Sequence, residues 1–175
     1  MSRIVVLNGT SSSGKTSIAR AFQELAPGTF LNFSIDSILY ALPPSTLERM
    51  KRGEERAGKG LVRAFYACVR AIAGEGVDLV IDHALTTESE ATMLAAATQS
   101  HRTLLVGIDC PVDVLNERER QRGDRRVGMA AAQAERVHQW LEYDLRVDSS
   151  RVSPEEAARQ IVALLTSSGS RARSI

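Results

Sequence analysis

Residues 9–16 read Gly-Thr-Ser-Ser-Ser-Gly-Lys-Thr, which matches the pattern G-x-x-x-x-G-K-S/T at every required position. The apolar run Ile4–Leu7 before it predicts a buried strand, and the amphipathic residues 17–25 after it predict a helix. In that setting the N–H groups of the loop and the start of the helix face phosphate oxygens. A Ser/Gly-rich turn containing Gly-Lys-Thr by chance is the alternative, but it leaves the flanking strand and helix unexplained. The stretch therefore predicts a nucleoside-triphosphate site.

The positions of the loop have different expected roles. Gly9 and Gly14 allow the backbone to turn sharply, Lys15 is expected to reach the β- and γ-phosphates, and the Thr16 hydroxyl is expected to bind Mg²⁺. The predicted nucleotide-binding residues are Gly9, Thr10, Ser11, Ser12, Ser13, Gly14, Lys15, Thr16, Ser17 and Arg118.

Composition indicates an ordinary globular enzyme of 175 residues, with one domain over 1–166 and a polar tail, 167–175, that is expected to be disordered. Lys and Arg number 22 against 21 Asp and Glu, so the net charge of +1 gives no reason to expect a nucleic-acid partner. No apolar run approaches the ~20 residues of a membrane span, and the first strand leaves no room for a signal peptide. We expect a cytoplasmic protein, with Cys68 and Cys110 as buried free thiols.

Strand-like and helix-like segments alternate along the chain, which predicts an α/β fold of the P-loop nucleoside-triphosphate hydrolase type: a five-stranded parallel sheet flanked by helices, with a short Arg-rich lid. The expected strands are 4–7, 30–35, 79–81, 103–108 and 145–147. The expected helices are 17–25, 61–73, 87–99, 112–121, 129–142 and one that begins at Ser153-Pro154.

Three acidic residues, Asp36, Asp82 and Asp109, follow predicted strands, and ligands bind beyond the carboxyl ends of such strands. Asp82 is the predicted second ligand of Mg²⁺, with a turn cap as the alternative. Asp36 is a predicted catalytic residue that accepts or orients the proton of an attacking hydroxyl, with a helix N-cap as the alternative. Asp109 is expected to cap the next helix.

The basic segment Arg118–Arg126 is predicted to form the lid, because guanidinium groups neutralise the charge that spreads over a transferred phosphoryl group. Arg122 and Arg125 are the predicted catalytic residues of this lid, with Lys15, and Arg118 is assigned to the nucleotide. The alternative is a solvated helix with Glu/Arg pairs, to which Arg120 is assigned.

Several other residues are expected to be structural. His101 and His138 are isolated, and the spacing of Cys and His does not suggest zinc. Trp140 and Tyr143 are expected to pack against the sheet. The role of His83 is left open, because this residue directly follows Asp82 at the sheet edge where ligands are expected to bind.

At this point the chain resembles the chloramphenicol phosphotransferase family of small P-loop kinases. The resemblance rests on Leu7–Lys15, on Asp36–Ser37 and on a C-terminal run that extends from Arg122-Gly-Asp-Arg125 through Gly128–Ala131, Gln133-Ala134, Val137-His138 and Glu142–Asp144 to Val147-Asp148. It implies transfer of the γ-phosphate of ATP to a hydroxyl group of a small molecule, in this family an antibiotic, with Asp36 as the catalytic base and Arg122–Arg125 in the lid.

Two departures from the family pattern leave the acceptor open: His83 stands where a second acid is expected, and the acceptor-side segment Leu47–Arg56 is strongly charged, which also fits a solvated loop. A nucleoside or nucleoside-monophosphate kinase is one alternative, with Arg49, Arg52 and Arg56 as sources of positive charge. A regulatory GTPase or nucleotide-binding protein is another, although the sequence contains neither Asn-Lys-x-Asp nor Asp-x-x-Gly.

Overall fold

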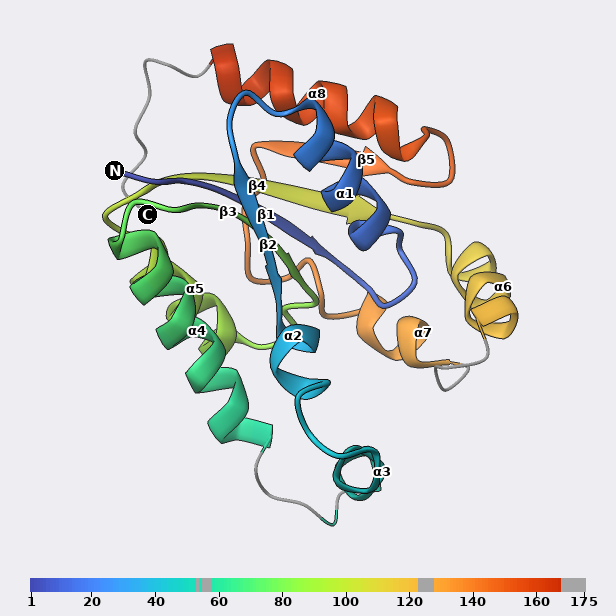
Figure 1. Ribbon diagram of the computed structural model, residues 1–175. Helices are drawn as coiled ribbons and strands as arrows, with labels where there is room; N and C mark the ends of the chain where they lie inside the picture. The colour runs from blue at the N-terminus through green and yellow to red at the C-terminus, as the bar shows by residue number, and fades with distance from the viewer. Residues whose placement is uncertain (53, 55–57, 123–127, 168–175) are drawn as a thin grey trace.

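The computed structural model describes residues 1–52, 54, 58–122 and 128–167, in which strands and helices alternate (Figure 1). The strands are β1 (Arg3–Gly9), β2 (Phe30–Ser34), β3 (Asp78–His83), β4 (Arg102–Asp109) and β5 (Leu145–Asp148). The helices are α1 (Lys15–Leu25), α2 (Ile35–Leu39), α3 (Pro44–Lys51), α4 (Gly58–Gly74), α5 (Glu88–Thr98), α6 (Val112–Arg122), α7 (Met129–Ala134) and α8 (Pro154–Ser167).

The five strands form one sheet in the order β2-β3-β1-β4-β5, and every neighbouring pair is parallel. This confirms the predicted five-stranded parallel sheet. β1 lies at the centre, between β3 and β4, so the loop that follows it emerges where the strand order changes direction. Open α/β sheets bind their ligands at that position.

Alternating side chains of β1 point to opposite faces of the sheet, so each face has its own core. Val5 and Leu7 pack on the face covered by α1 and α8, against Phe22 and Ile161 among others. Ile4 and Val6 face α4 and α5 on the other side. A strand buried on both faces is apolar at nearly every position, which explains the unbroken run at Ile4–Leu7.

Local signals in the sequence predicted the helix starts of α5 and α8. Thr87 accepts a hydrogen bond from Glu90 N while the Glu90 side chain accepts from Thr87 N, which is the predicted capping box. Ser153 Oγ accepts from Glu156 N at 3.2 Å at the start of α8.

Three expected elements differ from those in the structure. The second strand ends at Ser34 rather than Ile35, because Ser34 forms a capping box with Ser37 and starts α2 there. The charged segment 47–56, for which a solvated loop was one expectation, is helical over residues 47–51 as the second half of α3, which has Pro44 in its first turn. The helix expected over 129–142 ends at Ala134, and turns continue to residue 140.

The two cysteines are free, as expected, but the prediction that both are buried is wrong. Cys68 is exposed and Cys110 is half-buried. Cys68 lies on α4 between the buried residues Phe65 and Val69, and the apolar pattern of that helix did not separate its core face from its outer face. Among the described residues, no helix is long and apolar enough to cross a bilayer.

The close packing of β4 against Tyr143 gives a stability prediction. A Cβ added at Gly107 would lie 2.9 Å from the Tyr143 ring, which hydrogen bonds with Asn8 and His138 hold in place. Gly107→Ala is therefore expected to lower the free energy of unfolding by about 1–3 kcal/mol, measured by urea denaturation.

Gly74→Ala is the matched control, since nothing lies within 4 Å of a Cβ at this last residue of α4. It should leave the free energy of unfolding unchanged or raise it by up to about 1 kcal/mol. Equal destabilisation by the two substitutions would contradict this account of the packing.

Candidate active site

Three strands bring their carboxyl ends together at one edge of the sheet. Leu7 of β1 pairs with Asp82 of β3, and Asp82 pairs with Ser34 at the end of β2. The phosphate loop therefore follows β1 beside Asp82, and Asp36 lies two residues beyond the last pair of β2. This register explains how carboxylates 46 positions apart in the sequence reach one site.

The loop over residues 9–16 has the tight backbone that its glycines predicted. Gly14 has φ +89° and Ser12 has φ +60°, and both values lie in the left-handed region. A Cβ at Gly9 would lie 2.6 Å from the carbonyl oxygen of Ile108, so the loop leaves β1 in direct contact with the β4 backbone. α1 begins at Lys15, immediately after this turn.

Lys15 is buried, with 8% of its surface exposed. Its Nζ donates a hydrogen bond to the carbonyl oxygen of Thr10 at 2.7 Å and lies 3.7 Å from Asp82 Oδ1. A buried ammonium group is costly unless polar atoms surround it, and the loop supplies both a carbonyl dipole and a neighbouring carboxylate.

Thr16 and Asp82, the two predicted metal ligands, lie in direct contact. Thr16 Oγ1 donates to Asp82 Oδ2 at 2.6 Å. The structure thus brings together the hydroxyl that follows the loop lysine and the carboxylate at the end of β3, although 66 positions separate them in the sequence.

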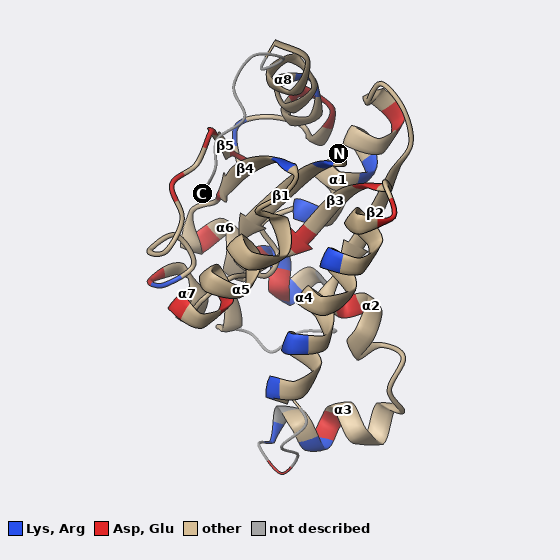
Figure 2. Ribbon diagram, turned by 90° about the vertical axis from the view of Figure 1, so that its left-hand side faces the viewer, with Lys and Arg blue, Asp and Glu red and all other residues tan. Residues whose placement is uncertain are grey.

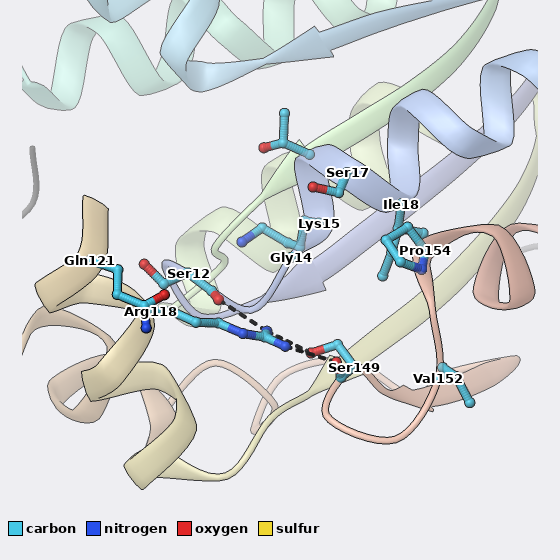
Figure 3. A pocket seen from close by; sticks show the side chains of 11 residues that line it. Ser12, Gly14, Lys15, Ser17, Ile18, Arg118, Gln121, Ser149, Val152 and Pro154 are labelled. Atoms are coloured by element: carbon cyan, nitrogen blue, oxygen red, sulfur yellow. Dashed lines mark hydrogen bonds between the residues drawn. The ribbon is translucent and has the colours of Figure 1, made fainter.

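A cavity of about 380 Å³ opens beside the loop, between α1, α6 and the segment that joins β5 to α8 (Figure 3). Its lining residues are Ser12, Gly14, Lys15, Thr16, Ser17, Ile18, Arg118, Gln121, Ser149, Val152 and Pro154. Arg118 extends across it from α6: Nη2 donates to Ser149 O at 2.9 Å, and Nη1 to Ser149 Oγ at 3.2 Å and Ser12 O at 3.4 Å. Arg118 thus lies beside the loop, where the sequence placed it.

Asp36 lies in the first turn of α2 and is half-buried, so neither the end of a strand nor the N-cap, which is Ser34, describes its position. Burial lowers the pKa of the nearby His83 ring, and the carboxylate of Asp36 opposes that shift slightly. Asp36 and Asp82 therefore both act electrostatically on the first residue after the β3 carboxylate.

His83 forms part of a buried aromatic cluster on the α4 side of this edge. Its ring stacks on Phe65 with 5.4 Å between the centroids, and Tyr66 packs edge-on at 5.7 Å. Burial lowers the pKa of His83, while Glu90, with Oε1 3.9 Å from Nε2, raises it in part. Within the described part of the chain, neither its ring nitrogens nor the Tyr66 hydroxyl has a hydrogen-bond partner.

The charged acceptor-side segment carries both signs of charge (Figure 2). Arg52 forms an exposed ion pair with Glu54, with 2.7 Å between Nε and Oε1. Arg56 lies outside the described residues.

The two predicted catalytic arginines of the lid fall at or beyond the edge of the described chain. Arg122 ends α6, and its side chain is not described, whereas Arg125 lies outside the described residues. The exposed pair of Arg120 with Glu117, on the outer face of α6, agrees with the alternative to which Arg120 was assigned.

Glu119 differs from the expected solvated helix face, because it is fully buried. Its carboxylate accepts hydrogen bonds from Gly128 N at 2.8 Å and Ala130 N at 2.9 Å, the N–H groups at the start of α7. An alternating Glu/Arg sequence gave no sign of this role, although Gly128, with φ +91°, marks the tight turn that presents these N–H groups.

Asn8 and Gln133 are two further polar residues at the site that sequence reasoning missed. Asn8, fully buried at the end of β1, accepts from Leu85 N and donates to Val137 O and Tyr143 Oη. Gln133 accepts from the main chain of the phosphate loop, as Ser11 N donates to its Oε1 at 2.6 Å.

The remaining expectations at this edge have mixed outcomes. Asp109 pairs with Arg146 and lies 3.4 Å from His138, so its carboxylate binds side chains of other elements instead of the expected helix start. Tyr143 packs against β4 at Gly107 as expected. Trp140 remains 40% exposed and does not pack as predicted, because it lies in the turns after α7.

The comparison with known protein families fits this geometry. A family model described as "Chloramphenicol phosphotransferase-like protein" matches residues 2–166. The chain belongs to this family. One relative is a Mycobacterium tuberculosis H37Rv protein named "Putative O-phosphotransferase". It is 28% identical to this chain over 180 residues, which cover 91% of this chain and 80% of the relative. As a member of the chloramphenicol phosphotransferase-like family, the chain is a kinase-type phosphotransferase.

Solved structures show the same fold at low sequence identity. A sugar kinase from Janibacter sp. HTCC2649 superposes with a TM-score of 0.69 at 21% identity, covering 95% of each chain. Shikimate kinase from Acinetobacter baumannii gives a TM-score of 0.67 at 14% identity, covering 98% of this chain and 97% of the other. The chain therefore has the fold of the P-loop kinases.

The burial of His83, which lowers the pKa of its ring, predicts how stability depends on pH. Because its pKa in the folded protein lies below the ordinary value of about 6.5, the folded state binds fewer protons than the unfolded chain between these two values. Stability is therefore complete above about pH 6.5 and decreases as the pH falls through that window.

His83→Phe should flatten this pH dependence and keep the free energy of unfolding at pH 7.5 within about 1 kcal/mol of the wild type, since the ring nitrogens lose no hydrogen bond. Urea denaturation between pH 5 and 7.5 measures the effect. The half-buried His138, whose pKa burial also lowers, accounts for the slope that remains. An unchanged slope in His83→Phe would contradict the assignment.

Proposed function

We propose that this protein transfers the γ-phosphate of ATP to a hydroxyl group of a small molecule, with Mg²⁺ as cofactor. The observation that carries the proposal is the convergence of Lys15, Thr16 and Asp82 at the carboxyl edge of the sheet. A buried ammonium group, a hydroxyl and a carboxylate at a strand-to-helix loop are the groups that hold a triphosphate and its metal ion.

The cavity beside the loop supports a nucleotide as the phosphoryl donor. Its volume, about 380 Å³, is within the range of small-molecule sites. The phosphates would bind the N–H groups of residues 12–17, and the Arg118 guanidinium, already held over the loop by Ser149, would face the nucleotide. In this arrangement α6 carries a nucleotide-binding residue and leads directly into the lid segment at Arg122 and Arg125.

The donor set fits magnesium. Thr16 Oγ1 and Asp82 Oδ2 are hard oxygen ligands that lie side by side, and Mg²⁺ keeps most of its waters while taking one or two protein oxygens. The described residues contain no group of three or more metal-binding side chains, which is consistent with a metal held jointly by protein, phosphate and water. When bound, the ion neutralises charge on the phosphate oxygens.

The proposed reaction is an in-line displacement. The oxygen of the acceptor hydroxyl forms a bond to the γ-phosphorus as the bond to the β–γ bridging oxygen breaks, and ADP leaves with that oxygen. Asp36 accepts or orients the hydroxyl proton, and Lys15 stabilises the charge that develops on the transferred group, with Arg122 and Arg125 as the proposed lid groups.

The acceptor is proposed to lie on the side of the edge formed by α2 and α4. The relative is named an O-phosphotransferase, and two of the solved structures are a sugar kinase and a shikimate kinase in complex with shikimate. These names support a small hydroxyl compound as acceptor.

Asp36→Asn tests the proposed acceptor chemistry. The substitution keeps the size of the side chain and removes its ability to take a proton, so kcat should fall by about 10²–10⁴ while the KM for ATP stays within about threefold. The measurement is ADP release with Mg·ATP over a panel of alcohols, sugars, aryl antibiotics, nucleosides and nucleoside monophosphates.

Asp113→Asn is the control, because Asp113 is an exposed acid on the first turn of α6 and does not line the cavity beside the phosphate loop. It should leave kcat unchanged. Wild-type kcat in Asp36→Asn would remove Asp36 from the mechanism, and phosphorylation of nucleoside monophosphates alone would replace the small-alcohol proposal.

A further inference from the structure

The phosphate loop has a side-chain contact from outside its own motif. Gln133 lies on α7, 122 positions from Ser11, and its Oε1 accepts the Ser11 N–H at 2.6 Å. The N–H groups of such loops ordinarily face phosphate, so a loop amide held by a glutamine on another helix requires a separate explanation.

The peptide unit between Thr10 and Ser11 is held at both ends. Its N–H donates to Gln133, and its C=O accepts from Lys15 Nζ at 2.7 Å. A peptide unit is planar, so its N–H and C=O point in opposite directions and rotate together. Gln133 therefore helps to set the direction of the carbonyl group that holds the lysine ammonium, together with Ser13, whose N–H donates to the same Thr10 oxygen at 3.3 Å.

Gln133 is itself fixed by anchors on either side of it along the chain. Before it, the buried Glu119 carboxylate accepts from Gly128 N and Ala130 N. After it, Val137 O accepts from Asn8 Nδ2 at 2.6 Å, and Asn8 lies in β1 directly before the loop. α7 is thus held between α6 and the central strand, with Gln133 between the two attachments.

We propose that Gln133 is a positioning residue for phosphoryl transfer, which acts on Lys15 through the Thr10–Ser11 peptide and places its ammonium group for the γ-phosphate. This inference rests on the proposed function. It assigns to α7 a part in positioning the lysine, and through Glu119 it connects that part to α6, the helix that carries Arg118.

The proposal makes a specific statement about nucleotide recognition. Lys15 Nζ reaches the β- and γ-phosphates, whereas the amides at the start of α1 hold the α- and β-phosphates. Loss of the Gln133 hydrogen bond should therefore weaken the binding of a triphosphate more than the binding of a diphosphate. If Gln133 only stabilised the fold, its substitution would lower the affinities for both nucleotides equally.

Gln133→Met is the test, since Met keeps the length and packing of the side chain and cannot accept the Ser11 N–H with comparable strength. Calorimetry with saturating Mg²⁺ measures the affinities for ADP and for the non-hydrolysable analogue AMP-PNP. The analogue should bind about 3–10-fold more weakly, the equivalent of one lost hydrogen bond, and ADP within about twofold of the wild type. kcat should fall along with the affinity for the analogue.

Gln139→Ala is the matched control, because Gln139 is exposed in the turns after α7 and its side-chain Nε2 donates to Glu135 O at 2.6 Å, a contact outside the phosphate loop. It should bind both nucleotides as the wild type does. Gln133→Asn, which is too short to reach Ser11, should repeat the effect of Gln133→Met and replaces it if that variant does not fold, as judged by thermal unfolding.

The outcomes separate this inference from the proposed function. Wild-type protein that binds neither nucleotide would refute the proposed function itself. Wild-type protein that binds both, with Gln133→Met either unchanged or weakened equally for ADP and AMP-PNP, would overturn the positioning role alone.

Discussion

The buried ammonium group of Lys15 is the constraint on which the arrangement of this site depends. A charge with 8% of its residue exposed must be surrounded by polar atoms, and the fold supplies them from separate elements: a carbonyl from the loop itself and a carboxylate from the end of β3. The position of β1 between β3 and β4 makes this possible, because it places the loop beside Asp82. The apolar faces covered by α1 and α8 on one side and by α4 and α5 on the other keep that register.

Features encoded over short stretches could be predicted from the sequence. The phosphate loop, the strands at Ile4–Leu7 and 103–108 and the capping box at Thr87 all depend on neighbouring residues, and all are present. The predicted ends of β2 and α7 were wrong, because Ser34 caps α2 and thereby ends β2, and because the chain turns after Ala134. The roles of Glu119 and Gln133 could not be predicted, since their partners are main-chain N–H groups that only the folded chain brings near: pattern and propensity do not encode such contacts.

The two sides of the site differ in how the chain builds them. The nucleotide side is a continuous motif completed by Arg118 and Ser149, which meet across the cavity in Figure 3. The side proposed for the acceptor is formed by α2, the end of β3 and α4, which come from separate parts of the sequence. His83 packs there against the buried side chains of Phe65 and Tyr66, with Glu90 near its ring.

A crystal structure with Mg²⁺ and a non-hydrolysable ATP analogue tests the central claim most directly, because it shows each contact of the triphosphate at once. The account predicts that the γ-phosphate contacts Lys15 Nζ and that the metal ion is bound by Thr16 and lies near Asp82. It also predicts that the Ser11 amide still donates to Gln133. A triphosphate bound away from residues 9–16, or a γ-phosphate that does not contact Lys15, would contradict it.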